Sequence, residues 1–273
     1  MSGVAIRLDG MTVIGAHVDQ TDPIAQARAR GADAVQIFLG DPQGWKGPEV
    51  RFDGGAPALK AAAAEAGVTL YVHSPYVINV ATTNNRIRIP SRKLLQQHVN
   101  LAAEIGAAGI VVHGGHVLAA DDPAKGYDNW RKCIDGMDMP IPVLIENTAG
   151  GTNSMARGVE KLERLWASVL EAKGGADVGF CLDTCHAYAG GEELAGLVGR
   201  VKAVTGRIDL VHANDSRDAF DSGADRHANL GQGSLPEADL IDLIREAGTP
   251  VIVETPGEAP EHAADIAWLR ERI

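Results

Sequence analysis

Six short apolar runs in this chain each end in a histidine, an aspartate or a glutamate. Residues 178–182 (Val-Gly-Phe-Cys-Leu) are followed directly by Asp183 and, three residues later, by His186. The other runs end at His73, His113, Glu146, His212 and Glu254. Because a short apolar run is typical of a buried strand, each of these side chains is expected where a strand ends. One shared site is the simplest explanation for the repetition.

The residue types of this site indicate metal binding. Asp225 and His227, in a long polar segment, add two more candidate ligands. Imidazole and carboxylate groups without a thiolate set favour Zn²⁺, then Mn²⁺ or Fe²⁺, because Mg²⁺ and Ca²⁺ prefer oxygen ligands. A catalytic zinc ion takes about three or four protein ligands and leaves one position open, so this number of ligands indicates more than one ion. The candidates are His73, His113, Glu146, Asp183, His186, His212, Asp225, His227 and Glu254.

Closely spaced divalent ions suit one kind of reaction in particular. They generate hydroxide at neutral pH and neutralise charge on both the attacking and the leaving oxygen, as hydrolysis of a phosphodiester requires. The sequence has no glycine-rich phosphate loop, no Ser-His-Asp set and no dinucleotide-binding fingerprint. The residues therefore favour metal-assisted hydrolysis of a phosphodiester.

Taken singly, each histidine has a simpler explanation as a hydrogen-bonded structural group. We interpret His17, His98 and His262 in that way, and we expect His98 and His262 to be solvated; the role of His116 stays open. For the candidate ligands as a set, metal binding is the better explanation. So many desolvated polar groups on one face are costly unless cations hold them together.

The elements that must position these groups alternate along the chain. Eight apolar strands are expected to alternate with eight helices, which predicts a (β/α)8 barrel with its ligands at the C-terminal ends of the strands; an open doubly wound sheet is the alternative. Residues 23–30 are expected to form a helix capped by Asp22. A longer helix is expected at residues 92–105, after a break at Pro90. Residues 39–48 and 216–235 are expected to be loops.

Composition sets the wider limits. The chain has 273 residues, 45% of them apolar, and no linker or change of composition, so residues 1–273 are expected to form one domain. The three cysteines make no even framework, which favours a reducing, cytoplasmic location. No leader or membrane-spanning run is expected. The formal net charge of −11 argues against a phosphate-backbone binder, unless bound cations offset it where it matters.

The motifs resemble a known family, the zinc-dependent apurinic/apyrimidinic (AP) endonucleases of the endonuclease IV type. The resemblance covers essentially the whole chain, and its most specific motifs are Asp183-Thr-Cys-His186 and Asp225-Arg-His227. The other motifs are Ile14-Gly-Ala-His17, His73-Ser-Pro-Tyr76, Val112-His113, Glu146-Asn-Thr-Ala-Gly150, His212-Ala-Asn-Asp215, Gly231-Gln-Gly233 and Glu254-Thr-Pro256.

The resemblance implies a barrel with three zinc ions, with Mn²⁺ as an alternative at one position. It implies cleavage of duplex DNA 5′ to an abasic site in base excision repair, by a monomer, leaving a 3′-hydroxyl. Removal of 3′ blocking groups is also expected. The first ion would take His73, His113 and Glu146. The second would take Glu146, Asp183, His212 and Glu254, and the third His186, Asp225 and His227, with Glu146 as the catalytic bridge.

The resemblance is weakest at the surface that would read DNA. The loop after the second expected strand is polar and partly basic in better-known members, whereas here it reads Gly40-Asp-Pro-Gln-Gly-Trp45. Gln43, Trp45 and Tyr76 are the expected DNA contacts. The alternative function is a metal-dependent sugar isomerase or epimerase of the xylose-isomerase type, for which Glu146, Asp183, His212 and Glu254 would suffice. A metal-binding protein without catalysis is a third reading.

Overall fold

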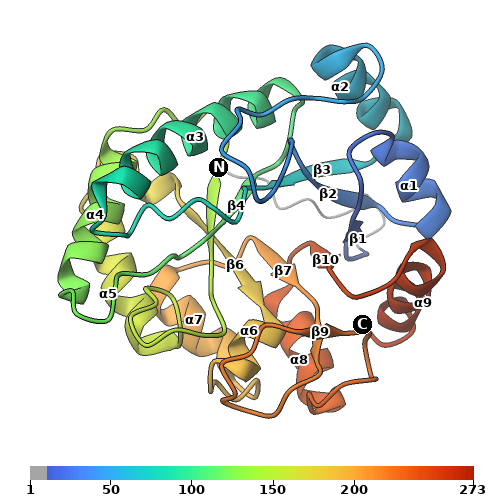
Figure 1. The fold of residues 1–273 in the computed structure, drawn as a ribbon. Helices are drawn as coiled ribbons and strands as arrows, with labels where there is room; N and C mark the ends of the chain where they lie inside the picture. The colour runs from blue at the N-terminus through green and yellow to red at the C-terminus, as the bar shows by residue number, and fades with distance from the viewer. Residues whose placement is uncertain (1–10) are drawn as a thin grey trace.

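Eight parallel strands close into a barrel, with helices around its outside (Figure 1). The structure, a computed structural model, describes residues 11–273. Around the barrel the strand order is β1-β10-β7-β6-β5-β4-β3-β2, which confirms the predicted barrel and excludes the open sheet. The barrel strands are β1 (Ile14–His17), β2 (Ala34–Phe38), β3 (Thr69–His73), β4 (Ile110–His113), β5 (Val143–Glu146), β6 (Gly179–Asp183), β7 (Leu210–His212) and β10 (Val251–Val253).

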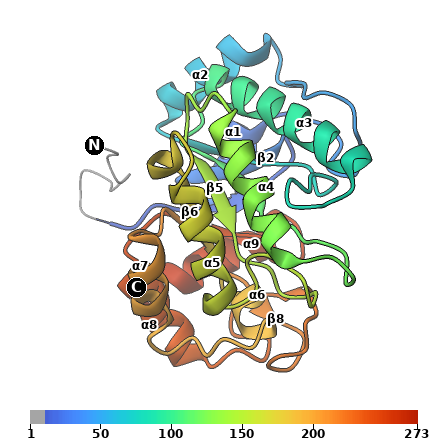
Figure 2. The ribbon, with the colours of Figure 1, turned by 90° about the vertical axis from the view of Figure 1, so that its left-hand side faces the viewer.

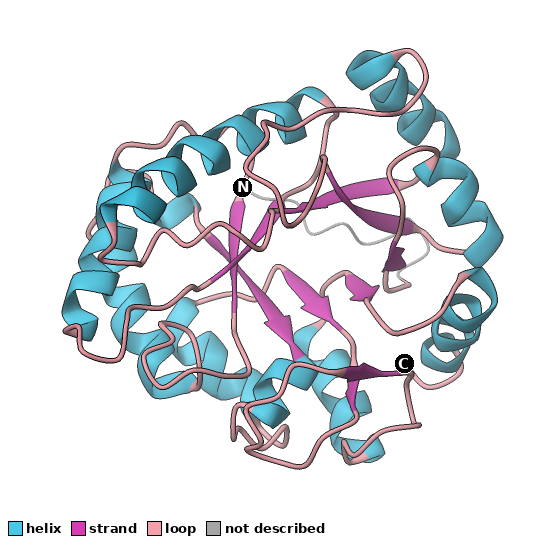
Figure 3. Ribbon diagram, in the orientation of Figure 1, coloured by secondary structure: helices cyan, strands magenta, loops and turns pink. Residues whose placement is uncertain are grey.

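The helices form the outer layer, as the side view in Figure 2 and the colouring by secondary structure in Figure 3 show. Among the described residues, none of them has both the length and the apolar character that crossing a membrane requires. The helices are α1 (Pro23–Arg30), α2 (Gly55–Ala66), α3 (Asn85–Glu104), α4 (Pro123–Asp135), α5 (Val159–Leu170), the 3₁₀ turn η1 (Gly175–Asp177), α6 (Thr184–Ala189), α7 (Leu197–Thr205), α8 (Glu237–Ala247) and α9 (Ala259–Arg270).

Local signals set most helix ends. Helix α1 begins as predicted, with the Asp22 side chain accepting a hydrogen bond from the Ala25 N–H, and it ends at Gly31 with a left-handed φ of 62°. The predicted start of α3 was wrong. This helix is capped by Asn84 and passes through Pro90, whose missing N–H leaves only one helical hydrogen bond unmade.

One apolar side chain from each strand, or from the residue just before it, closes the inside of the barrel. Together these side chains form a buried cluster separate from the larger core between the strands and the helices. We call this cluster the inner layer. Its members are Val13, Ala34, Tyr71, Val111, Leu144, Cys181, Leu210 and Ile252.

The long polar connection after β7 is not simply a loop. It leaves through β8 (Asp215–Ser216) and returns through β9 (His227–Ala228), and these two short strands pair in an antiparallel ladder. Asp215 fixes the segment that follows, because its carboxylate accepts hydrogen bonds from the N–H groups of Gly233 and Leu235. The ladder holds His227, and with it Asp225 two residues earlier, near the C-terminal ends of the barrel strands.

Two histidines expected in solvent are buried, so that prediction was wrong. His262 is 6% exposed and bridges the Arg30 guanidinium and the Thr255 carbonyl oxygen. His98, on the inner face of α3, is 1% exposed, and neither of its ring nitrogens has a hydrogen-bond partner among the described residues. Burial lowers the pKa of His98 to about 4.

This histidine should make stability depend on pH. Because the folded pKa of about 4 lies below the unfolded value of about 6.5, its contribution is complete above pH ~6.5 and is lost as pH falls towards 4. Between pH 7.5 and pH 5 the loss should be about 2 kcal/mol. Urea unfolding of the parent and of His98→Leu at both pH values measures it. Between the two pH values, His98→Leu should lose about 2 kcal/mol less stability than the parent. Equal losses in the two proteins would contradict the low pKa of His98.

Candidate metal centre

The candidate ligands lie one step above the inner layer. Alternate side chains of a strand point to the same side, and in six strands the residue two positions after the inner-layer member is a histidine or a carboxylate. The pairs are Tyr71 with His73, Val111 with His113, Leu144 with Glu146, Cys181 with Asp183, Leu210 with His212 and Ile252 with Glu254. The period of a strand therefore converts six distant sequence positions into one ring.

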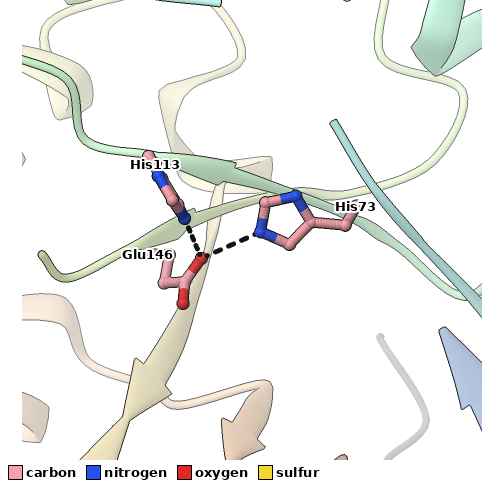
Figure 4. A group of neighbouring side chains, drawn as sticks. All are labelled: His73, His113 and Glu146. Carbon is pink, nitrogen blue, oxygen red and sulfur yellow. Dashed lines mark hydrogen bonds and ion pairs between the residues drawn. The ribbon is translucent and has the colours of Figure 1, made fainter. Parts of the chain in front are cut away.

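His73, His113 and Glu146 form the first group. Figure 4 shows both imidazoles directed at the same carboxylate oxygen. The Nε2 atoms of His73 and His113 lie 3.3 and 3.2 Å from Glu146 Oε2. Glu146 is completely buried, so these two contacts fix the direction of that oxygen.

The other oxygen of Glu146 belongs to a second group, with Asp183, His212 and Glu254. The distance from His212 Nδ1 to Glu146 Oε1 is 3.0 Å, and that to Glu254 Oε2 is 3.3 Å. Asp183 Oδ2 lies 4.0 Å from the same nitrogen. Glu146 therefore joins the first and second groups through its two oxygens.

A third group consists of His186, Asp225 and His227. Asp225 Oδ1 lies 3.0 Å from His186 Nε2 and 3.2 Å from His227 Nε2. Both nitrogens are buried, yet neither makes a hydrogen bond to a described residue. Two ring nitrogens and one carboxylate oxygen thus converge on a point without forming hydrogen bonds to one another, which is the arrangement of ligands around an ion.

Backbone carbonyls hold three of the histidines in one tautomer. A carbonyl oxygen only accepts hydrogen bonds, so a ring nitrogen facing one must carry the proton. His73 Nδ1 donates to Ser74 O at 2.7 Å, His186 Nδ1 to Asn147 O at 3.0 Å and His227 Nδ1 to Glu254 O at 3.1 Å. Their Nε2 atoms are left free to bind a metal ion.

The pKa values of Glu146 and His186 show how the charges in this cluster depend on one another. Burial alone would raise the pKa of Glu146, but His212 and His113 hold it well below its ordinary value. Burial would also lower the pKa of His186, which Asp183, Asp225 and Glu146 instead raise well above its ordinary value. The carboxylates of this centre therefore stay ionised beside positive charge, which protonated histidines supply in the absence of ions and which bound cations would supply in their place.

The distances also fit a metal ion. Two ligand atoms that share a tetrahedral zinc ion at about 2.0–2.1 Å lie about 3.3 Å apart. The nitrogen–oxygen separations in the first group are 3.3 and 3.2 Å. Cys185 lies close to Asp183 and His227, and burial raises the pKa of its thiol to about 12; the three groups described above consist of imidazole and carboxylate donors alone. The residues present fit borderline divalent ions such as zinc.

Two asparagines hold this arrangement together from outside. Asn147 donates to Asp183 O at 2.9 Å and accepts from Asp183 N at 2.7 Å. Asn214 donates to Asp183 Oδ2 at 2.7 Å and accepts from Glu254 N at 2.8 Å. Asp183 Oδ1 in turn caps α6 by accepting from His186 N at 2.7 Å. Both asparagines therefore support the ligands without belonging to any of the three groups.

A pocket of about 500 Å³ opens above the centre. Tyr76, 54% exposed, stands at its rim, with its ring centroid 5.7 Å from that of His113. Arg217 and Arg226 also line the pocket, although the Arg226 guanidinium is ion-paired with Asp218. Sequence reasoning did not single out either arginine, because only the folded connection between β8 and β9 brings them to the rim.

The other expected DNA contacts lie on the neighbouring loop. Gln43 and Trp45 are exposed, the indole to 47%. The Tyr76 N–H donates to Pro42 O at 2.8 Å, which joins this loop to the rim of the pocket. His17, expected to be structural, lies beside the centre, with Nδ1 3.5 Å from Glu254 Oε1. His116 is exposed and belongs to none of the three groups.

Comparison with known proteins decides the family. The family described as "Xylose isomerase-like TIM barrel" matches residues 24–272. A Mycobacterium tuberculosis protein named probable endonuclease 4 is 54% identical over 260 residues, which cover 95% of this chain and 98% of the relative. The chain belongs to the endonuclease IV family. A Mycobacterium marinum protein of the same name is 53% identical over 96% of this chain and 99% of the relative.

Solved structures agree with this family. Endonuclease IV from Thermus thermophilus superposes with a TM-score of 0.81 at 27% identity, covering 95% of this chain and 98% of that one. A D-tagatose 3-epimerase-like protein superposes with a TM-score of 0.77 at 18% identity, covering 95% and 96%. At that identity the epimerase likeness establishes the barrel alone, which endonuclease IV shares.

Proposed function

We propose that this protein is a zinc-dependent AP endonuclease of base excision repair that cleaves duplex DNA 5′ to an abasic site. The products would be a 3′-hydroxyl and a 5′-deoxyribose phosphate, and the same site would remove 3′ blocking groups. The observation that carries the proposal is Glu146, whose two oxygens join two ligand groups beneath an open pocket. We further propose that the chain, residues 1–273, acts as one domain and as a monomer in the cytoplasm.

The described residues would divide the work as follows. His73, His113 and Glu146 would hold one zinc ion, Glu146 with Asp183, His212 and Glu254 a second, and His186, Asp225 and His227 a third. When bound, such ions supply an activated water and neutralise charge on the scissile phosphate. Tyr76 at the rim stays protonated, because burial and the carboxylates of Glu254 and Glu146 raise its pKa, so its hydroxyl can donate to a phosphate oxygen.

An abasic site is a favourable target for such a pocket. Turning a nucleotide out of the duplex costs a few kcal/mol, and the cost is least where no base must be unstacked. Arg217 and Arg226 line the pocket and would attract the phosphates on either side. The exposed Trp45 would pack against the DNA.

A sugar epimerase is the competing assignment, since the second group alone would serve a mononuclear sugar site. It leaves the first and third groups unexplained. Incision of a duplex oligonucleotide bearing one abasic-site analogue, with elemental analysis of the same sample, separates the two. Cleavage 5′ to the lesion with about three zinc ions per chain would support the endonuclease. A single ion, no cleavage and turnover of a ketohexose would overturn it.

Replacing Trp45 by alanine should weaken binding to abasic duplex roughly 10-fold, the size of one lost aromatic–nucleotide contact, without changing the zinc content. Fluorescence anisotropy with a labelled duplex measures the affinity. Leu170→Ala is a matched control, because Leu170 is 55% exposed and ends α5, on the face of the barrel opposite the site. Equal affinities of Trp45→Ala and the parent would remove this loop from the DNA surface.

A further inference from the structure

Gln36 occupies a position in the ring of ligands without being a ligand. It lies on β2 two residues after Ala34, a member of the inner layer, and the same step places a candidate ligand on six other strands. Its side chain is completely buried. A polar residue in the middle of the strand Ala-Val-Gln-Ile-Phe was visible in the sequence, but it follows no apolar run and was not singled out.

Its amide reaches two of the candidate ligands. Gln36 Nε2 lies 2.6 Å from Glu254 Oε1 and 3.1 Å from His17 Nδ1. Gln36 Oε1 lies 2.9 Å from His212 Nε2. The side chain thus connects β2 with β10 and β7, which are not its neighbours in the barrel.

These contacts determine which amide atom of Gln36 donates a hydrogen bond, which one accepts, and which ring nitrogen of His212 carries the proton. An ionised carboxylate only accepts hydrogen bonds, so the amide nitrogen must face Glu254 and the amide oxygen must face His212. That oxygen is also only an acceptor, so His212 Nε2 must carry the proton. The lone pair of His212 is therefore on Nδ1, the nitrogen that lies 3.0 Å from Glu146 Oε1.

His212 is in this respect unlike the other buried ligands. His73, His186 and His227 have their tautomer fixed by backbone carbonyls on Nδ1, whereas the tautomer of His212 depends on a side chain. The same amide takes up Glu254 Oε1 and leaves Oε2 directed at His212 Nδ1, 3.3 Å away. One residue therefore presents two ligands of the second group.

We propose that Gln36 is a positioning residue for the second metal ion, setting the tautomer of His212 and the carboxylate oxygen that Glu254 offers. This inference rests on the proposed function for the identity of the ion and its reaction, but not for the hydrogen bonds that carry it. Such outer partners of metal ligands are typically worth 10–100-fold in metal affinity or activity.

The first test reads the tautomer directly. Long-range ¹H–¹⁵N correlation spectra of zinc-loaded protein with ¹⁵N-labelled histidine distinguish protonated Nδ1 from protonated Nε2. In the parent, His212 should carry its proton on Nε2, and His73, His186 and His227 should carry theirs on Nδ1. In Gln36→Met, the signals of His212 should change, together with those of His17, whose Nδ1 also faces the amide, while those of His73, His186 and His227 should stay as in the parent. A parent protein with His212 protonated on Nδ1 would overturn the proposal.

The second test measures metal binding and turnover. Gln36→Met should weaken the binding of one zinc ion about 10- to 100-fold in competition with a chromophoric chelator, and should lower kcat for incision with little change in KM. Gln96→Leu is the control, because Gln96 also makes three side-chain hydrogen bonds but lies on the outer helix α3. Equal zinc affinities of Gln36→Met and this control would overturn the proposal.

The two proposals fail in different ways. Circular dichroism of each variant reports folding, and if Gln36→Met does not fold, the histidine spectrum of the parent still decides the question. If the parent binds zinc and shows the expected tautomers but does not incise abasic DNA, the proposed function fails while the role of Gln36 stands. If the parent incises DNA and Gln36→Met binds zinc normally, the proposed function stands while the role of Gln36 fails.

Discussion

The Glu146→Gln protein is expected to fold and yet to incise abasic duplex at least about 100-fold more slowly than the parent, since the loss of an outer partner alone reaches that figure. Glutamine has nearly the same shape, but it brings an N–H group and no charge to a place where two oxygens face histidines. Glu146 Oε2 lies 3.2 Å from His113 Nε2, and Oε1 lies 3.0 Å from His212 Nδ1. The change therefore damages two ligand groups at once.

Single-turnover incision with excess enzyme measures the rate, and elemental analysis should show a loss of zinc from the same sample. Glu163→Gln is the matched control, because Glu163 is exposed on α5; it should incise like the parent. A Glu146→Gln protein with near-parental incision would exclude the carboxylate as a bridge between two ions.

Removal of the metal should be the second large effect. Four of the proposed ligands are carboxylates, and they converge with five histidines in a centre that is largely buried, with Asp225 exposed at its edge. Bound ions would stabilise the folded chain, because the unfolded chain does not hold these ligands together. Zinc at about a hundred times its dissociation constant stabilises a protein by about 3 kcal/mol, which for a chain of this size corresponds to a rise in Tm of about 6–12 °C.

Exhaustive chelation should therefore abolish incision and lower Tm by at least that amount, and added Zn²⁺ should restore both. Mg²⁺ should restore neither, because it prefers oxygen ligands. Differential scanning fluorimetry and the incision assay can be run on the same samples. Full incision after chelation, with metal content confirmed at zero, would rule out a metal-dependent reaction.

The sequence was sufficient to predict the barrel and the set of candidate ligands, because both depend on local patterns. An apolar run followed by His113 or Glu146 carries its own information about where a strand ends. The burial of His98 and His262 could not be predicted, since it depends on which helix faces pack together. Pro90 misled for a similar reason, because tertiary packing maintained α3 through a residue that weakens helices.

The role of Gln36 lies between the features that the sequence predicts and those that it does not. Its position two residues after Ala34 follows the same period as the ligands, but that period becomes visible only once the inner layer is known. Arg217 and Arg226 depend on the course of a long connection, which no local pattern specifies. The two arginines that line the pocket were accordingly absent from the prediction of DNA contacts.

Among the described residues, the eight packed side chains of the inner layer close the metal centre from below. The pocket beside Tyr76 and Arg217 opens above it and offers a path for ions, water and reaction products. Duplex DNA would cover that opening while it is bound. Metal exchange through it and substrate binding would then exclude each other in time, and an enzyme that has engaged damaged DNA would retain ions that use this path until it lets the product go.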